Sequence, residues 1–263
     1  MEILPAERLE LILEFIDDKG TVNIIDLTNK FNVSKPTILR DLKELEKQNL
    51  IIRIHGGAKS KKLKGTRFEP RHVIKEQEAI QEKEEIAQLA FKHIYSGETV
   101  LLDSGTTTLL LAKKLAAQCT ENITAITNDI KNAMVLSEND LIDIVVVGGQ
   151  KRKGVYSLNG PFAEDMLRQL NVDKVFLGTD AIDADKGLTN SNIDETNIKK
   201  TMMKIANEII LLADDRKFNQ VAFSSVAGID ALDRIITNKP LSDAEMKEYK
   251  KAGISIDIPQ AKN

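Results

Sequence analysis

The stretch VLLDSGTTTLLLAKKL, from Val100 to Leu115, decides the fold class of this chain. An apolar, strand-like run ends in Asp103, a small hydroxyl-rich turn follows, and the apolar residues after it recur with helical spacing. A turn between a strand and the start of a helix offers free N–H groups, and these groups stabilise an anion. The stretch therefore predicts an α/β fold with an anion-binding turn, and it leaves open whether an enzyme or a sensor uses that turn.

Strand-like and helix-like segments alternate on both sides of this stretch. The strand-like runs are continuously apolar, which is typical of parallel strands that are covered on both faces. Residues 73–263 are therefore expected to form a doubly wound, mostly parallel α/β domain. The predicted strands span residues 99–102, 123–126, 142–147, 174–178, 209–212, 235–236 and 254–256. The predicted helices span residues 80–94, 108–117, 130–137, 161–170, 194–208 and 242–251.

Polar residues follow the ends of several predicted strands, and ligands of such sheets bind beyond the carboxyl ends of the strands. Gly105 lets the backbone approach an anion, the threonines after it add hydroxyl donors, and Lys217 supplies a full positive charge. Carboxylate and amide groups at Asp103, Asn128 and Asp180 suit sugar hydroxyls. The candidate ligand residues are Asp103, Ser104, Gly105, Thr106, Thr107, Thr108, Thr127, Asn128, Gly148, Gly149, Asp180, Glu195 and Lys217.

The first sixty residues have a different pattern, with three short amphipathic helices and one strand. The helices are expected over residues 5–17, 24–31 and 35–48, with Ser34 as the cap of the third helix and Pro36 in its first turn. A strand over residues 50–54 then ends in a Gly-Gly turn. This order predicts a winged helix-turn-helix domain over residues 1–57 and a linker over residues 58–72. A small helical dimerisation module is the alternative that the pattern leaves open.

Charge supports the DNA-binding interpretation. Residues 33–64 carry nine Lys or Arg and three Asp or Glu, whereas the whole chain has a net charge of −3. One short positive region on an otherwise acidic chain is expected of a small module that binds a polyanion, although a solvated helix and a Lys-rich linker would give the same count. The candidate DNA-binding residues are Ser34, Lys35, Thr37, Arg40, Lys43, Lys47, Arg53 and His55.

Composition and missing motifs argue against several other classes. A single cysteine, Cys119, cannot form an intramolecular disulfide framework, and the three histidines lie far apart without metal-ligand spacing. No Walker A or G-x-G-x-x-G loop is present, so neither a nucleotide cofactor nor a metal is expected. The apolar run over residues 9–16 is broken by Glu10 and Glu14 and is neither a signal peptide nor a membrane span. The sequence predicts a cytoplasmic protein without membrane contact.

The stretch SKPTILRDLKELEKQNLIIRIHGGA, residues 34–58, resembles the signature of the DeoR family of bacterial transcriptional regulators. The matching residues are Arg8, Ser34, Thr37, Arg40, Asp41, Leu42 and the run from His55 to Ala58. The position two after Thr37 is usually Arg or His in the family, and here it is Leu39. The resemblance implies a winged helix that reads operator DNA, and the departure at Leu39 implies one DNA contact fewer.

The resemblance extends to the larger domain. The matching pieces are DSGTTT, the Thr-Asn pair at residues 127–128, the Gly-Gly pair, GLTN at residues 187–190, and the Asp-x-x-Lys-Phe motif at residues 214–218. The family resemblance implies a sensor domain similar to ribose-5-phosphate isomerase and glucosamine-6-phosphate deaminase. A phosphorylated sugar would be its effector, and a homodimer or homotetramer would act as repressor of a carbohydrate-utilisation operon. Asp215 and Arg216 depart from the serines that are common in the family.

Two other functions stay open at this point. Asp180, Asp183, Lys186 and Glu195 lie where sugar-phosphate isomerases keep acid–base groups, so an isomerase-like enzyme fused to a DNA-binding module is the main alternative. The fused winged helix, and the absence of His from the candidate pocket segments, count against catalysis, and fold similarity does not carry function. A DNA-binding scaffold without a ligand is the third class. We expect a regulator and not an enzyme.

Overall fold

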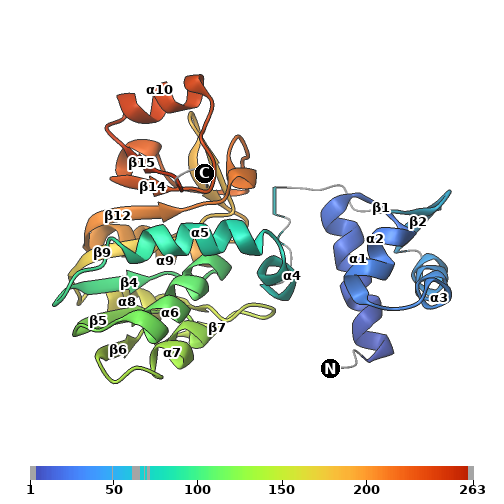
Figure 1. Cartoon of the computed structure of the whole chain (residues 1–263), viewed down its shortest axis with the longest axis horizontal. Coiled ribbons are helices and arrows are strands. Elements are labelled where there is room, and N and C mark those ends of the chain that lie inside the picture. Colours follow the sequence, from blue (N-terminus) through green and yellow to red (C-terminus); the bar gives the residue numbers. More distant parts are fainter. Residues whose placement is uncertain (1–3, 49, 61–65, 68, 70–71, 260–263) are drawn as a thin grey trace. The chain divides into compact units, whose positions relative to one another are not determined.

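The computed structural model describes residues 4–48, 50–60, 66–67, 69 and 72–259, and the chain divides into two compact units, Met1–Lys75 and Glu76–Asn263 (Figure 1). No helix within these described residues is long and apolar enough to cross a membrane. After the functions expected from the sequence, the first unit is called the DNA-binding unit below, and the second is called the sensor unit.

The DNA-binding unit is a winged helix, as the sequence predicts. Its helices are α1 (Pro5–Lys19), α2 (Ile24–Phe31) and α3 (Lys35–Lys47), and its antiparallel sheet has the order β1 (Thr21–Asn23), β3 (Gly57–Ser60), β2 (Ile51–Ile54). Strands β1 and β3 are absent from the sequence prediction because neither TVN nor GAKS contains a run of apolar residues. In the linker predicted for residues 58–72, residues 58–60 pair within the wing and residue 72 begins α4 (His72–Gln77), while residues 61–65, 68, 70 and 71 lie outside the described residues.

The wing turn requires its two glycines. Gly56 has a φ of 76°, in the left-handed region that favours glycine. A Cβ on Gly57 would lie 2.0 Å from the carbonyl oxygen of Val22, because β1 pairs with β3 at that point. Under the wing, Ile12, Ile16 and Leu42 are fully buried in one core.

The sensor unit is built on a seven-stranded sheet in which every neighbouring pair is parallel. Its order is β15 (Ser255–Asp257), β14 (Arg234–Ile236), β12 (Ala206–Leu212), β9 (Val172–Leu177), β4 (Thr99–Leu102), β5 (Ile123–Thr127), β6 (Ile142–Val146).

Helices cover both faces of this sheet, which confirms the doubly wound fold (Figure 1). Successive residues of β4 show why: Val100 and Leu102 pack into one core, and Leu101 packs into the other. The first core is shared with α5 (Ile80–Phe91), α6 (Thr106–Gln118) and α7 (Ile130–Leu136). The second is shared with α8 (Pro161–Leu167), α9 (Ile193–Ile205) and α10 (Asp243–Lys251).

Smaller strands lie outside the main sheet. A three-stranded antiparallel sheet has the order β10 (Ala181–Asp183), β11 (Gly187–Asn190), β13 (Ser224–Ala227), and β7 (Gln150–Lys151) pairs with β8 (Leu158–Asn159) as a hairpin. Two short 3₁₀ turns, η1 (Asp215–Lys217) and η2 (Ile229–Ala231), complete the unit. The helix predicted over residues 194–208 ends three residues too late, because β12 begins directly at Ala206 without a Gly or Pro between.

The order of the strands places a topological switch between β4 and β9. The chain runs from β4 to β5 and β6 on one side, and then returns to β9, β12, β14 and β15 on the other. The loops that leave β4 and β9 therefore separate at this edge, and such a crevice is where open α/β sheets bind ligands.

Candidate functional site

Helix α3 carries a row of exposed polar side chains over a buried apolar face. Ile38, Leu42 and Leu45 are buried, whereas Arg40, Lys43 and Lys47 are exposed together with Ser34 and Lys35 at the start of the helix. The Ser34 hydroxyl lies 2.9 Å from that of Thr37 and also accepts the Thr37 N–H at 3.4 Å. The helix thus presents its basic face to solvent.

Two residues that match the family pattern have a structural role. The Arg8 Nε and Nη2 groups donate to the two carboxylate oxygens of Asp41 at 2.7 and 3.2 Å, and this bidentate contact joins α1 to α3. The hydrogen bond to Asp41 is the main reason that the pKa of Arg8 is raised. Leu39 is half-buried against the core of the unit, so an apolar contact stands where the family usually has a cation.

The wing supplies two further candidates. His55 is exposed at the turn between β2 and β3. Arg53 is half-buried, and its Nε donates to the carbonyl of Gly57 at 3.3 Å. All eight predicted DNA-binding residues thus lie on α3, its cap or the wing.

The topological switch of the sensor unit holds a buried ion pair. Asp103 follows β4 and Lys199 lies on α9, and their side chains are 3% and 4% exposed. The Lys199 ammonium donates to the Asp103 carboxylate and, at 2.9 Å, to the carbonyl of Gly178 after β9. The Gly178 N–H donates to the same carboxylate at 2.9 Å. One carboxylate oxygen of Asp103, a predicted contact for sugar hydroxyls, thus binds the loop after β9 and helix α9.

The hydroxyl-rich turn forms the start of α6. Leu109 N–H is bonded to Gly105, so the N–H groups before it have no partner within the helix. Among the described residues no side chain caps this helix. Thr106 is half-buried and Thr107 is 9% exposed, whereas the buried Thr108 donates its hydroxyl to the carbonyl of Gly105 at 2.9 Å. The Thr108 hydroxyl is therefore already engaged within the turn.

Polar groups after β5 brace this turn. The Ser104 hydroxyl donates to Asp129 at 2.5 Å, and the Thr127 hydroxyl donates to the carbonyl of Leu102 at 2.8 Å. Asn132, which sequence reasoning did not select, is fully buried and donates to the carbonyl of Asp103 at 3.2 Å. Ser104 and Thr127 thus hold the loop in place.

Asn128 is the member of this loop whose amide faces a neighbouring hairpin. Its Nδ2 donates to the carbonyl of Leu158 at 3.2 Å, and its buried Oδ1 has no hydrogen-bond partner among the described residues. Gly148 has open space around it, whereas a Cβ on Gly149 would lie 2.8 Å from the carbonyl oxygen of Asn159. Gly149 thus allows the close approach of Asn159 in β8, whereas the space around Gly148 would accept a side chain.

The two acidic candidates are bonded to neighbouring groups. Asp180 is half-buried and accepts the N–H of Ser191 at 2.9 Å. Glu195 accepts the Ser157 hydroxyl at 3.1 Å, and Arg152 approaches it to 3.2 Å. Both carboxylates are thus engaged by neighbouring groups of the same unit.

Lys217 belongs to a charged cluster after β12. Arg216 donates through Nε to Asp214 at 2.8 Å, and Asp214 is 2% exposed. Burial raises the pKa of Asp214, but the Arg216 hydrogen bond and the charges of Lys217, Arg216 and Lys83 outweigh it and the pKa is lowered. Lys83 of α5 is 4% exposed, and its burial lowers its pKa to about 8. Three cations thus surround one buried carboxylate at this edge.

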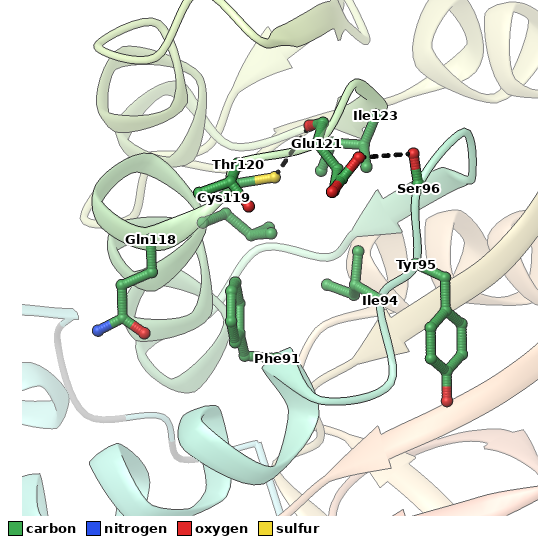
Figure 2. Close-up of a pocket in the computed structure, with 10 residues that line it drawn as sticks. Phe91, Ile94, Tyr95, Ser96, Gln118, Cys119, Thr120, Glu121 and Ile123 are labelled. Atoms are coloured by element: carbon green, nitrogen blue, oxygen red, sulfur yellow. Dashed lines mark hydrogen bonds between the residues drawn. The ribbon is translucent and has the colours of Figure 1, made fainter.

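A separate cavity lies at the opposite edge of the sheet. It has a volume of about 160 Å³ and is lined by residues before β4 and β5 and at the start of β5, among them Tyr95, Cys119 and Ile123 (Figure 2). The Cys119 thiol donates to the carbonyl of Glu121 at 3.2 Å, and Ser96 donates to the Glu121 carboxylate at 3.1 Å. None of the predicted ligand residues lines it. Within the described part of the chain, no group of His, Cys, Asp and Glu residues is arranged to hold a metal ion.

Comparison with known proteins covers both units. Residues 8–64 match the model of the DeoR-like helix-turn-helix domain, and residues 78–239 match that of the DeoR C terminal sensor domain. The transcriptional regulator GlpR of Haloferax volcanii is 35% identical over 97% of this chain and 98% of its own length. The putative aga operon transcriptional repressor of Escherichia coli O157:H7 is 32% identical over 95% of this chain and 93% of its own length. The transcriptional repressor AccR of Agrobacterium fabrum is 36% identical over 88% of this chain and 89% of its own length.

Among solved structures, ribose 5-phosphate isomerase A of Methanocaldococcus jannaschii is 20% identical, with a TM-score of 0.39 over 52% of this chain and 53% of its own. That likeness is too low to support any argument about function. The matches to full-length regulators instead decide between the alternatives left open by the sequence. The chain belongs to the DeoR family of helix-turn-helix transcriptional regulators, and it is a regulator with a sensor domain and not an enzyme.

Proposed function

We propose that this regulator represses a carbohydrate-utilisation operon and leaves its operator when a phosphorylated sugar binds the sensor unit. Relatives named as repressors support the direction of control. The observation that carries the effector assignment is the uncapped first turn of α6, which lies at the topological switch beside the loops after β5 and β9. Free N–H groups and the positive end of a helix dipole stabilise a phosphate group.

Each candidate residue has a part in this proposal. The N–H groups of Thr106, Thr107 and Thr108 and the hydroxyls of the first two would hold the phosphate, with Lys217 as the nearby cation. Asn128, whose Oδ1 has no partner in the described part of the chain, and Asp180 would contact sugar hydroxyls. Glu195 would fix the β7–β8 hairpin through Arg152. The remaining candidates, Asp103, Ser104, Gly105, Thr127, Gly148 and Gly149, would shape the site through the backbone contacts described above.

The DNA-binding unit would read a repeated or palindromic operator. One winged helix is rarely sufficient for tight binding, so we propose a homodimer or homotetramer that spaces two copies of α3 along the duplex. Exposed Arg40 would contact a base edge, and Lys43 and Lys47 would contact phosphates. His55 and Arg53 of the wing would contact the adjacent backbone.

Calorimetric titration of sugars and their phosphates tests the effector site. A charge-assisted hydrogen bond contributes about 1.5–3 kcal/mol, so the loss of two or more should weaken the free sugar at least about a hundredfold. Thr107→Val removes a hydroxyl at constant volume and should weaken the phosphosugar without changing operator affinity.

If the threonines serve only to begin α6, Thr107→Val would instead lower the melting temperature and leave ligand binding unchanged. Equal affinity of the wild-type protein for a sugar and for its phosphate would overturn the proposed phosphate site.

A further inference from the structure

Residues 76–80 are called the elbow below; they comprise the last two residues of α4, the two-residue connection and the first residue of α5. Residue 76 is the first residue of the sensor unit, so the elbow is the point at which the chain enters this unit from the DNA-binding side (Figure 1). Its acidic residues, Glu76 and Glu78, are half-buried. A change in the backbone conformation of the elbow therefore acts directly on the segment that leads back to the DNA-binding unit.

Two ion pairs tie the elbow to opposite sides of the topological switch. Lys131, at the start of α7 after β5, donates to Glu76 at 2.7 Å. Arg216, in η1 after β12, approaches Glu78 to 3.5 Å. Since the strand order is β12, β9, β4, β5, these two cations flank the loops that follow β4 and β9. The elbow is therefore bonded across the edge at which the effector site is proposed.

Both cations are linked to residues of the proposed site. The Lys131 N–H donates to Asp129 at 2.8 Å, and Asp129 accepts the hydroxyl of Ser104 in the turn before α6. The Lys131 ammonium lies 4.4 Å from the ring centroid of Tyr156. Arg216 precedes Lys217 and is bonded to Asp214. A new negative charge at the turn would thus act on the same cations that hold the elbow.

The elbow also contains a strained residue. Ala79 has φ 48° and ψ 46°, a left-handed conformation that is unfavourable for a residue with a Cβ atom. Its carbonyl accepts the N–H of Lys83 and so begins α5. Such strain persists only where surrounding contacts hold it, and it is found at switch regions. The pairs at Glu76 and Glu78 are contacts of this kind.

We propose that the elbow is a latch that an anionic effector releases. Glu76 and Glu78 hold Lys131 and Arg216 in the unliganded protein, a bound phosphate group draws both cations toward the first turn of α6, and the freed elbow relaxes at Ala79. This mechanism rests on the proposed phosphate site. It explains how phosphate binding at that site changes the conformation of the segment before residue 76. In this mechanism the two glutamates compete with the effector for positive charge.

Binding of inorganic phosphate to the full-length chain tests the competition. The variants are Glu76→Gln, Glu78→Gln and the double variant, with Glu84→Gln as control, because Glu84 is an exposed glutamate of α5. Each partly exposed pair should contribute a factor of about 1.4 to 5 in affinity, and distant pairs add, so the double variant should bind phosphate up to about 25-fold more tightly. Glu84→Gln should bind like wild type at the same ionic strength.

Hydrogen exchange of the amides over residues 76–83 gives a second readout. Phosphate should speed exchange of the elbow in the wild-type chain and should change it little in the double variant, where the latch is already open. Unchanged or weaker phosphate binding by the double variant, or slower elbow exchange with phosphate in the wild type, would overturn the latch and leave the phosphate site standing. A wild-type chain that binds no phosphate would refute the proposed site, and the latch with it.

Discussion

Lys199→Met should destabilise the sensor unit much more than the loss of an exposed ion pair. Methionine keeps the unbranched stem of lysine in α9 and removes the ammonium that bonds Asp103 and the carbonyl of Gly178. Both charged side chains are at most 4% exposed, so water cannot replace the lost partner. The variant leaves a buried carboxylate with the N–H of Gly178 as its remaining donor.

The magnitude follows from this burial. Removal of one partner of a buried ion pair costs about 3–5 kcal/mol, and the Gly178 N–H that stays in place favours the lower end, about 3 kcal/mol. For a unit of this size, that loss lowers the melting temperature by about 6–12 °C. Asp103→Asn in the Lys199→Met background should restore about half of the loss or more, because a neutral amide costs less to bury than an unpaired carboxylate.

Tyrosine fluorescence during urea unfolding of the full-length chain measures the effect. Tyr95, Tyr156 and Tyr249 all lie in the sensor unit and the chain has no Trp, so the signal reports on this unit alone. A Lys199→Met variant within about 1 kcal/mol of wild type would refute the reasoning, and so would a double variant no more stable than the single one. Loss of phosphosugar binding at unchanged stability would instead make Lys199 a ligand group.

Three further predictions concern other parts of the chain. Arg40→Ala should weaken operator binding by about 1–3 kcal/mol and relax its sequence preference. Lys47→Ala should weaken binding to all DNA sequences alike and reduce the slope of log affinity against log salt concentration by about one. Fluorescence anisotropy titrations in which the two variants behave alike would contradict these separate roles. Burial lowers the pKa of Lys83 from 10.5 to about 8, so the folded state binds fewer protons than the unfolded state between these values. The free energy of unfolding of the wild type should therefore rise with pH relative to that of Lys83→Met between pH 8 and 10.5, and the difference between the two should be constant below pH 8. Urea unfolding at a series of pH values measures this difference, and a constant difference over the whole range would refute the lowered pKa. Gly57→Ala should separate β1 from β3, because the added Cβ would lie 2.0 Å from the carbonyl oxygen of Val22. Thermal melts should show a loss of about 1–3 kcal/mol in the stability of the DNA-binding unit, while the tyrosine signal of the sensor unit stays unchanged.

The main sheet could be predicted from the sequence because its strands are mostly apolar and the central ones, such as β4 and β9, are buried on both faces. Strand β4 occupies the predicted residues 99–102, and β6 is one residue shorter than predicted. The edge where polar residues gather could also be predicted, since carboxyl ends of parallel strands share one edge. By contrast, GLTN has the composition of a turn but forms the buried strand β11, whose side chains all pack inside. Its pairing with β13 is a long-range contact that no local pattern contains.

The partners of the site residues could not be predicted. Lys199 lies 96 positions from Asp103, and a lysine on a helix is ordinarily exposed. Glu195 has the position of an acid–base group in the sequence, and only the fold brings Arg152 beside it. The role of the elbow could not be predicted from the sequence either. Glu76 and Glu78 have the pattern of ordinary solvated charges, and only the fold brings Lys131 and Arg216 beside them.

Operator affinity measured during titration with a sugar phosphate tests the central claim most directly. The operator fragment, the full-length chain and the ionic strength stay constant, and the matching unphosphorylated sugar is titrated in parallel. A coupling of about 1–3 kcal/mol between the two sites predicts that a phosphosugar which binds the sensor unit lowers operator affinity about 5- to 150-fold, while the free sugar leaves it unchanged. Operator affinity that stays constant at saturating phosphosugar, or that responds equally to the free sugar, would contradict the account.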